Sequence, residues 1–358
     1  MGLFGSKGKV PKPEPQVGQP NASSEIGVTP DQIPIETRIQ SAIASKHGLY
    51  PHEILLLQYA QSFDLSGKTS NRFWKYRYNI DDAKPYLLSL QERGFIKETD
   101  LPQALERQPV AALKDVLSAN GLPVSGKKDG LIKRALESIP ESILSARFPE
   151  RSFCRTEQGE DALKEEAYVP YIHSCTIEDL DIWSLNRLVH TEPSYPFRDK
   201  IWGYLNQRSL EHIRNDNFGL YRNCRLSMAR FLLEEKKDAD ALGLFAEVVF
   251  YDLCGASNGF DPRRVQMYLG SMFPYENSSI KIAPGIITYI DGCQKELDYS
   301  DEQLRTALVE RMSKISAPLQ FFTPEECADI VLLERDKNEE ALTHLYVTAK
   351  GRADLQFG

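Results

Sequence analysis

The feature that most constrains the fold is a pair of apolar periodic segments in QPVAALKDVLSANGLPVSGKKDGLIKRALESI, residues 108–139. The apolar positions of the first segment are Val110, Leu113, Val116 and Leu117, and those of the second are Leu131, Ile132, Ala135 and Leu136. This three- and four-residue spacing predicts two helices, each with one apolar face. Gly121 lies between them and predicts the end of the first helix. The chain must therefore form a helix, a short extended loop and a second helix here.

The loop GLPVSGKK (residues 121–128) is close to a phosphate-binding loop, because Gly121, Gly126 and Lys127 have the correct spacing. The position that should offer a hydroxyl to Mg²⁺ is Lys128, and Pro123 lacks one of the N–H groups that would hold phosphate. A helix is predicted before the loop, where a phosphate-binding loop needs a strand. The sequence therefore excludes a nucleotide-hydrolysing site here.

The second predicted helix is suited to binding a sugar–phosphate backbone and not the phosphates of a bound nucleotide. On a helical wheel, Lys127, Lys133 and Arg134 lie opposite the apolar stripe, with Gly130 between them. A helix N-terminus beside lysines attracts phosphate, and a glycine allows a sugar–phosphate backbone to come close. We also expect Ser125 to cap this helix.

The stretch closely resembles the SAP domain, a helix–extended loop–helix module that commonly binds DNA. The resemblance rests on its apolar spacing, on Gly121-Leu122 and on Ser125-Gly126-Lys127-Lys128. It implies duplex DNA as partner, contacted mainly at phosphates, with a preference for A·T-rich or minor-groove sites. The predicted DNA-binding residues are Lys114, Ser125, Gly126, Lys127, Lys128, Gly130, Lys133 and Arg134.

The flanking segments predict a winged-helix-like unit formed by residues 35–99 and 151–175, with residues 100–150 inserted in the wing. We expect a helix near Pro51, a strand in RFWKYRYNI, a helix over 81–93, and strands at 95–97 and 153–156, the last followed by a helix that Thr156 opens. The first strand would offer Arg72, Lys75 and Arg77 as a second DNA contact. Two unrelated small elements are the alternative.

The fold class we expect is mainly α, and residues 176–358 form an all-helical domain. Two antiparallel helices are expected at 220–235 and 239–254, and capping boxes at Ser300 and Thr323. Residues 1–139 hold 18 Lys and Arg against 15 Asp and Glu, whereas residues 140–358 hold 25 against 36. A polyanion should therefore bind the first part, and the acidic helical domain should contact an unidentified protein partner.

The remaining sequence features concern disorder, metal-binding and catalytic motifs, and cellular location. Residues 1–34 are rich in Pro, Gly and Lys, which predicts a disordered tail. The six cysteines are widely spaced, and no histidine–cysteine pattern typical of a metal site or hydrolase motif occurs. We expect neither enzyme activity, nor a metal, nor a cofactor. The absence of a long apolar run and of a secretory signal predicts a cytoplasmic protein without membrane contact.

Two functional hypotheses follow. In the first, the chain is a DNA-associated protein of the kind found in bacteria and prophages, to which the rest of the chain is similar. In the second, it is a protein-interaction scaffold whose helical hairpin and helical domain both bind proteins. Salt dependence distinguishes them, because phosphate contacts release counterions and apolar contacts do not.

Overall fold

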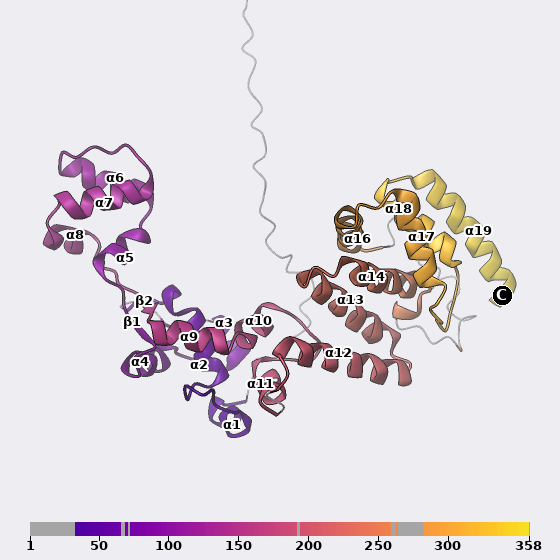
Figure 1. The fold of residues 1–358 in the computed structure, drawn as a ribbon, viewed down its shortest axis with the longest axis horizontal. Helices are drawn as coiled ribbons and strands as arrows, with labels where there is room; N and C mark the ends of the chain where they lie inside the picture. Colours follow the sequence, from indigo (N-terminus) through magenta and orange to yellow (C-terminus); the bar gives the residue numbers. More distant parts are fainter. Residues whose placement is uncertain are drawn as a thin grey trace, which may run out of the picture. The chain divides into compact units, whose positions relative to one another are not determined.

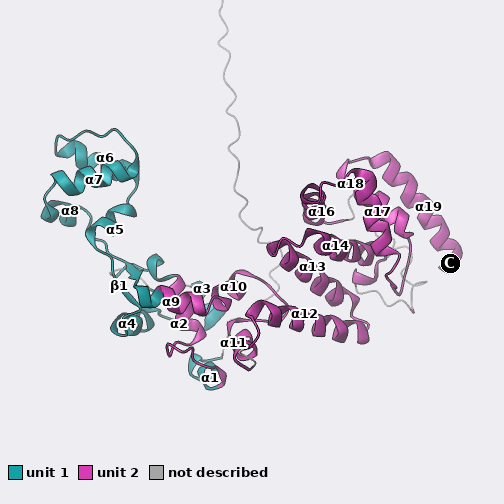
Figure 2. Ribbon diagram, viewed as in Figure 1, with its two compact units in different colours: residues 1–40, 59–159 teal, residues 41–58, 160–358 magenta. Residues whose placement is uncertain are grey.

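The computed structural model describes residues 33–65, 69–70, 72–191, 194–258, 263 and 282–357, and these are mainly helical, with one two-stranded sheet (Figure 1). The chain forms two compact units (Figure 2). Unit 1 holds residues 1–40 and 59–159, and unit 2 holds residues 41–58 and 160–358. Residues 41–58 therefore belong with the C-terminal helices. Nearly all of the predicted tail, residues 1–32, lies outside the described residues.

The strand predicted in RFWKYRYNI is wrong: residues Arg72–Tyr78 form helix α3. Trp74 and Tyr78 are four residues apart on one helix face, and both are buried. Their rings contact each other, and the ring of Trp74 also contacts those of Tyr59 and Phe63. Aromatic residues at every second position include pairs that are four residues apart. The same pattern therefore fits both a strand and one face of a helix. Phe73 is left exposed on α3.

The two later strands are confirmed, and they pair with each other. Strand β1 (Ile96–Glu98) runs antiparallel to β2 (Phe153–Arg155), with Lys97 opposite Cys154. Helix α4 (Lys84–Glu92) precedes β1 and α9 (Glu157–Glu165) follows β2. The Thr156 hydroxyl accepts the N–H of Gly159, as expected of a residue that opens a helix. Residues 100–150 are thus inserted between two paired strands, while the winged-helix assignment itself stays a prediction.

The inserted segment contains four helices: α5 (Leu101–Glu106), α6 (Val110–Ala119), α7 (Lys128–Ser138) and α8 (Glu141–Arg147). Their apolar faces share one core. Its buried members are Leu101, Leu105, Leu113, Val116, Leu117, Leu131, Ile132, Ala135, Ile139, Leu144 and Phe148. Leu136, expected in the same stripe, is 37% exposed. The periodicity of α6 and α7 therefore predicted most of this core.

Unit 2 is a series of helices. They are α2 (Pro51–Gln58), α10 (Tyr168–Ser174), α11 (Ile182–Thr191), α12 (Phe197–Arg214), α13 (Phe218–Glu234), α14 (Asp238–Leu253), α16 (Pro284–Glu296), α17 (Asp301–Met312), α18 (Pro324–Arg335) and α19 (Glu339–Phe357). Short helices α1 (Ile35–Ser41), η1 (Ala60–Ser62) and η2 (Ala256–Asn258) complete the described elements. The predicted antiparallel pair is confirmed as α13 and α14.

Four turns of unit 2 have the same geometry. Each places a non-glycine residue at a φ of 53–57° after a helix, at Asp216, Lys236, Asp298 and Lys337. The next N–H then bonds back to a carbonyl five residues earlier, as Lys237 does to Leu232. The capping boxes expected at Ser300 and Thr323 are confirmed. Among the described residues, no helix is long and apolar enough to cross a membrane.

Buried His52 predicts a pH-dependent stability of unit 2. Its ring lies 5.4 Å from that of Trp183, and burial lowers its pKa to about 3. The unfolded chain binds this proton below about pH 6.5, and the folded chain does so only near pH 3. The contribution of neutral His52 to stability is therefore fully present above pH 6.5. Below pH 6.5, the free energy of unfolding falls by up to about 1.4 kcal/mol per pH unit.

Urea denaturation at a series of pH values measures this slope. We expect His52→Phe to flatten it between pH 6.5 and 4, while substitution of the exposed His344 by Gln leaves it unchanged. Equal slopes in His52→Phe and the native chain would contradict the assignment.

Candidate nucleic-acid interface

Helix α6 ends in a glycine turn that directs the following loop. Gly121 has a φ of 68°, and its N–H donates to the Ser118 carbonyl. The N–H of Leu122 donates to the Leu117 carbonyl, and the Leu122 side chain packs on the core of the inserted segment. This pattern of bonds is a Schellman motif, in which glycine avoids the steric cost of the left-handed conformation. The turn fixes the start of the extended loop 123–127.

Helix α7 begins without the serine cap that the sequence suggested. Its N-cap is Lys127, whose side chain makes no capping hydrogen bond to any described residue, and Ser125 lies two residues earlier. Lysine has no acceptor atom in its side chain, so it cannot accept the N–H groups of the first turn. The N–H groups of Lys128, Asp129 and Gly130 precede the first intrahelical bond, which Leu131 donates to Lys127. The N–H donors of the first turn and the positively charged Lys127 are therefore both located at the N-terminus of α7.

Four of the predicted DNA-binding residues lie around this end and are exposed: Ser125, Gly126, Lys127 and Gly130. A Cβ atom added to Gly130 would have no heavy atom within 4 Å, so the surface there is open. Lys133, one turn further along, is 76% exposed and lies 3.8 Å from Glu137. The structure thus gathers Gly126, Lys127, Gly130 and Lys133 on α7 and its approach, and we call these four residues the α7 phosphate face.

Two other predicted residues bond to the protein itself. The Lys128 ammonium donates to the carbonyl of Glu106 at the end of α5. Arg134 donates through one nitrogen to the carbonyls of Pro123 (2.7 Å) and Ser125 (3.1 Å). Arg134 therefore holds the extended loop against α7, and Lys128 joins α7 to α5. We assign both of them a positioning role, which their spacing in the sequence did not indicate.

The remaining predicted contacts lie elsewhere. Lys114 is exposed on α6. Arg72, Lys75 and Arg77 are on α3, where the Lys75 ammonium pairs with Asp81 at 2.8 Å. Because α3 is a helix, Lys75 and Arg77 do not share one side as they would in the predicted strand.

A shallow groove of about 420 Å³ lies between α5 and α7. Pro102, Ile132 and Leu136 supply its apolar surface. Its charged lining consists of Glu106, Asp129, Lys133 and Glu137. Three carboxylates against one ammonium disfavour phosphate in this groove. The groove is therefore net acidic, and Lys133, which also belongs to the α7 phosphate face, is the one basic residue among the described residues that line it.

The comparison with protein families agrees with this geometry. Residues 104–140 match the family model of the SAP domain. A SAP domain suggests DNA binding in general. The match covers α6 and α7 completely, together with the last residues of α5, and we call residues 104–140 the SAP module. No curated protein matches the chain.

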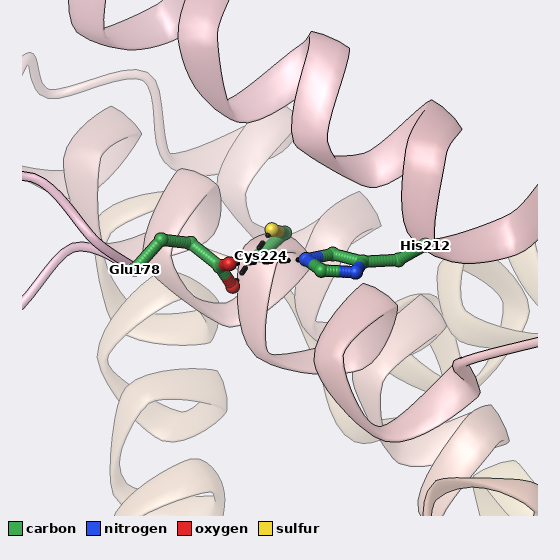
Figure 3. Close-up of side chains that lie close together, drawn as sticks. All are labelled: Glu178, His212 and Cys224. Atoms are coloured by element: carbon green, nitrogen blue, oxygen red, sulfur yellow. Dashed lines mark hydrogen bonds and ion pairs between the residues drawn. The ribbon is translucent and has the colours of Figure 1, made fainter. Parts of the chain in front are cut away.

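Unit 2 contains a cluster that sequence analysis missed. Glu178, His212 and Cys224 come from the turn before α11, from α12 and from α13, and their side chains converge (Figure 3). Glu178 is separated from His212 by 34 residues and from Cys224 by 46. No short metal-binding spacing joins such positions, so only the packing of α12 against α13 brings them together.

Proposed function

We propose that the chain is a non-enzymatic DNA-associated protein that binds duplex DNA through the α7 phosphate face of its SAP module. The contacts are mainly to phosphate oxygens. The observation that carries this proposal is the open, uncapped start of α7, where amide donors, Lys127 and the bare backbone of Gly130 meet. Phosphate contacts position a protein on DNA without reading sequence, so any preference should follow groove shape and A·T content.

The double variant Lys127→Ala/Lys133→Ala tests this proposal. Loss of two phosphate contacts should reduce the log–log salt slope of binding by about 1.8, since each contact contributes about 0.9. Affinity should fall by a similar factor on A·T-rich and G·C-rich duplexes, because neither lysine reads bases. Fluorescence anisotropy of labelled duplexes at several salt concentrations measures both quantities.

The matched control is Lys164→Ala, since Lys164 on α9 is also 76% exposed and lies outside the SAP module. Its salt slope should equal that of the native chain. Binding whose slope is the same in the double variant and the native chain would refute a phosphate site on α7.

The groove between α5 and α7 supports a second candidate, in which the SAP module binds a protein. Partly exposed Leu136 would be a main contact for an apolar side chain of the partner. Under this alternative, Leu136→Asn abolishes partner capture, high salt has little effect, and DNA does not compete. Under the DNA proposal, Leu136→Asn leaves DNA affinity within about twofold.

We further propose that unit 2 contacts a protein partner. A cavity of about 680 Å³, lined by α12, α13, α14 and α17, supports this proposal. Partly exposed Trp202 and exposed Arg311 belong to its lining. Mixed aromatic and arginine linings are typical of protein-binding surfaces. Trp202→Ala should abolish capture of the partner while leaving the DNA salt slope unchanged.

A further inference from the structure

The cluster of Glu178, His212 and Cys224 has the geometry of a small polar site inside unit 2. His212 Nε2 lies 3.0 Å from Glu178 Oε2, and Cys224 Sγ lies 3.1 Å from Glu178 Oε1 (Figure 3). One ligand atom from each residue can be chosen so that all three lie within 4.8 Å of one another. The side chains of Glu178 and His212 are 8% and 7% exposed, and Cys224 is fully buried. A sulfur, a nitrogen and an oxygen donor therefore share one protected position.

This donor set fits a borderline divalent cation. Zn²⁺ binds thiolate sulfur at about 2.3 Å, and imidazole nitrogen and carboxylate oxygen at about 2.0–2.2 Å. In a tetrahedral site with those bonds, neighbouring donors are separated by about 3.3–3.7 Å. The observed separations of 3.0 and 3.1 Å, which end on different oxygens of Glu178, need to widen by a few tenths of an ångström. The donor atoms of His212 and Cys224 lie within 4.8 Å of each other and need to reach the same range. Hard cations such as Mg²⁺ and Ca²⁺ prefer oxygen ligands alone, so the thiol disfavours them.

The charges also balance. A thiolate and a carboxylate would neutralise a divalent cation, with the imidazole as a neutral third ligand. The Arg208 guanidinium lies 3.5 Å from Glu178 and 2.7 Å from Glu211, so it can orient the Glu178 carboxylate from the side. Burial and the adjacent carboxylate raise the pKa of Cys224 to about 12, so metal binding must release its proton.

The backbone conformation of Glu178 indicates that its surroundings hold this residue in place. Its φ is 45°, a region that favours glycine, and it lies in a tight turn in which the N–H of Leu180 donates to the Ile177 carbonyl. Such a conformation persists where the surroundings fix it. Without metal, the three side chains form a hydrogen-bonded triad, and this triad is the alternative to a metal site.

We propose that Glu178, His212 and Cys224 bind one Zn²⁺ ion, with water as the fourth ligand. The ion joins the turn before α11 to α12 and α13 and stabilises unit 2. This role is independent of DNA binding, because the site lies wholly in unit 2, whereas the SAP module belongs to unit 1.

Cobalt substitution of the chelator-treated chain of residues 1–358 tests this proposal, because Co²⁺ takes zinc's place and gives an absorption band when a thiolate binds it. We expect the near-ultraviolet thiolate-to-cobalt band to saturate at one equivalent and to disappear in Cys224→Ser. Zn²⁺ should compete for the site and raise the melting temperature of the native chain. Cys254→Ser is the matched control: Cys254 is a buried thiol that donates to the Tyr251 carbonyl.

Circular dichroism confirms that each variant is folded. Should Cys224→Ser not fold, Glu178→Gln serves in its place: it retains the thiolate band but binds Co²⁺ at least tenfold more weakly. A folded native chain that gives no thiolate band with excess Co²⁺ contains only the hydrogen-bonded triad, which overturns the proposal. A band that survives Cys224→Ser, or that is lost in Cys254→Ser, overturns it as well.

Discussion

Glu247→Leu should destabilise unit 2 by about 3–5 kcal/mol, because it removes the acid from a buried ionic network. The Glu247 side chain is 6% exposed and accepts a hydrogen bond from the Tyr221 hydroxyl. Arg225 lies 3.2 Å from one carboxylate oxygen and Arg311 lies 3.5 Å from the other. Without the carboxylate, the largely buried Arg225 would keep its charge with no neutralising partner in this network.

Urea denaturation of the chain, monitored by circular dichroism, measures this loss as a shift in the unfolding transition of unit 2. Glu247→Gln keeps a hydrogen-bond acceptor and should lose less. Substitution of Glu310, which pairs with Lys314 on the surface, should leave the midpoint nearly unchanged. If Glu247→Leu unfolded at the same urea concentration as the Glu310 variant, the network would not stabilise the unit.

Leu131→Ala should unfold the SAP module while unit 2 remains folded. Leu131 is fully buried in the core that α5, α6, α7 and α8 share, and its truncation costs about 2–5 kcal/mol. A module this small seldom has more than about 3–5 kcal/mol of stability, so the loss is comparable to the whole.

Limited proteolysis measures this change through cleavage between residues 101 and 148. Leu136→Ala is the matched control on the same helix, because Leu136 is 37% exposed and buries less apolar area. Leu131→Ala should be cut rapidly, and Leu136→Ala should resist cleavage nearly as well as the native chain. Equal resistance in the two variants would mean that the shared core does not hold the module together.

The sequence predicts the helices of the SAP module well because their determinants are local. The apolar spacing of α6 and the left-handed turn at Gly121 act within a few residues, and so does the apolar face of α7. The strands β1 and β2 were also predicted, although their pairing depends on contacts across more than fifty residues. Local patterns therefore identify elements even where tertiary contacts complete them.

The errors have tertiary causes. The period-two pattern of α3 also fits an i,i+4 aromatic face, and packing of Trp74 against Tyr59 and Phe63 decides between the two. Arg134 bonds to loop carbonyls, which have no signature in the side-chain sequence. Glu178, His212 and Cys224 are joined only by the arrangement of helices in unit 2. Such sites can be recognised only when the three-dimensional structure is known.

Hydrogen–deuterium exchange of the full chain, with and without a short duplex at low salt, tests the DNA-binding claim most directly. The α7 phosphate face predicts slower exchange across residues 123–133 when DNA is present, since the free amides at the start of α7 would donate to phosphate. At the same DNA concentration, Lys127→Ala/Lys133→Ala should show weaker protection of this region, because its affinity for DNA is lower. Unchanged exchange in residues 123–133 of the native chain at saturating DNA would contradict the account.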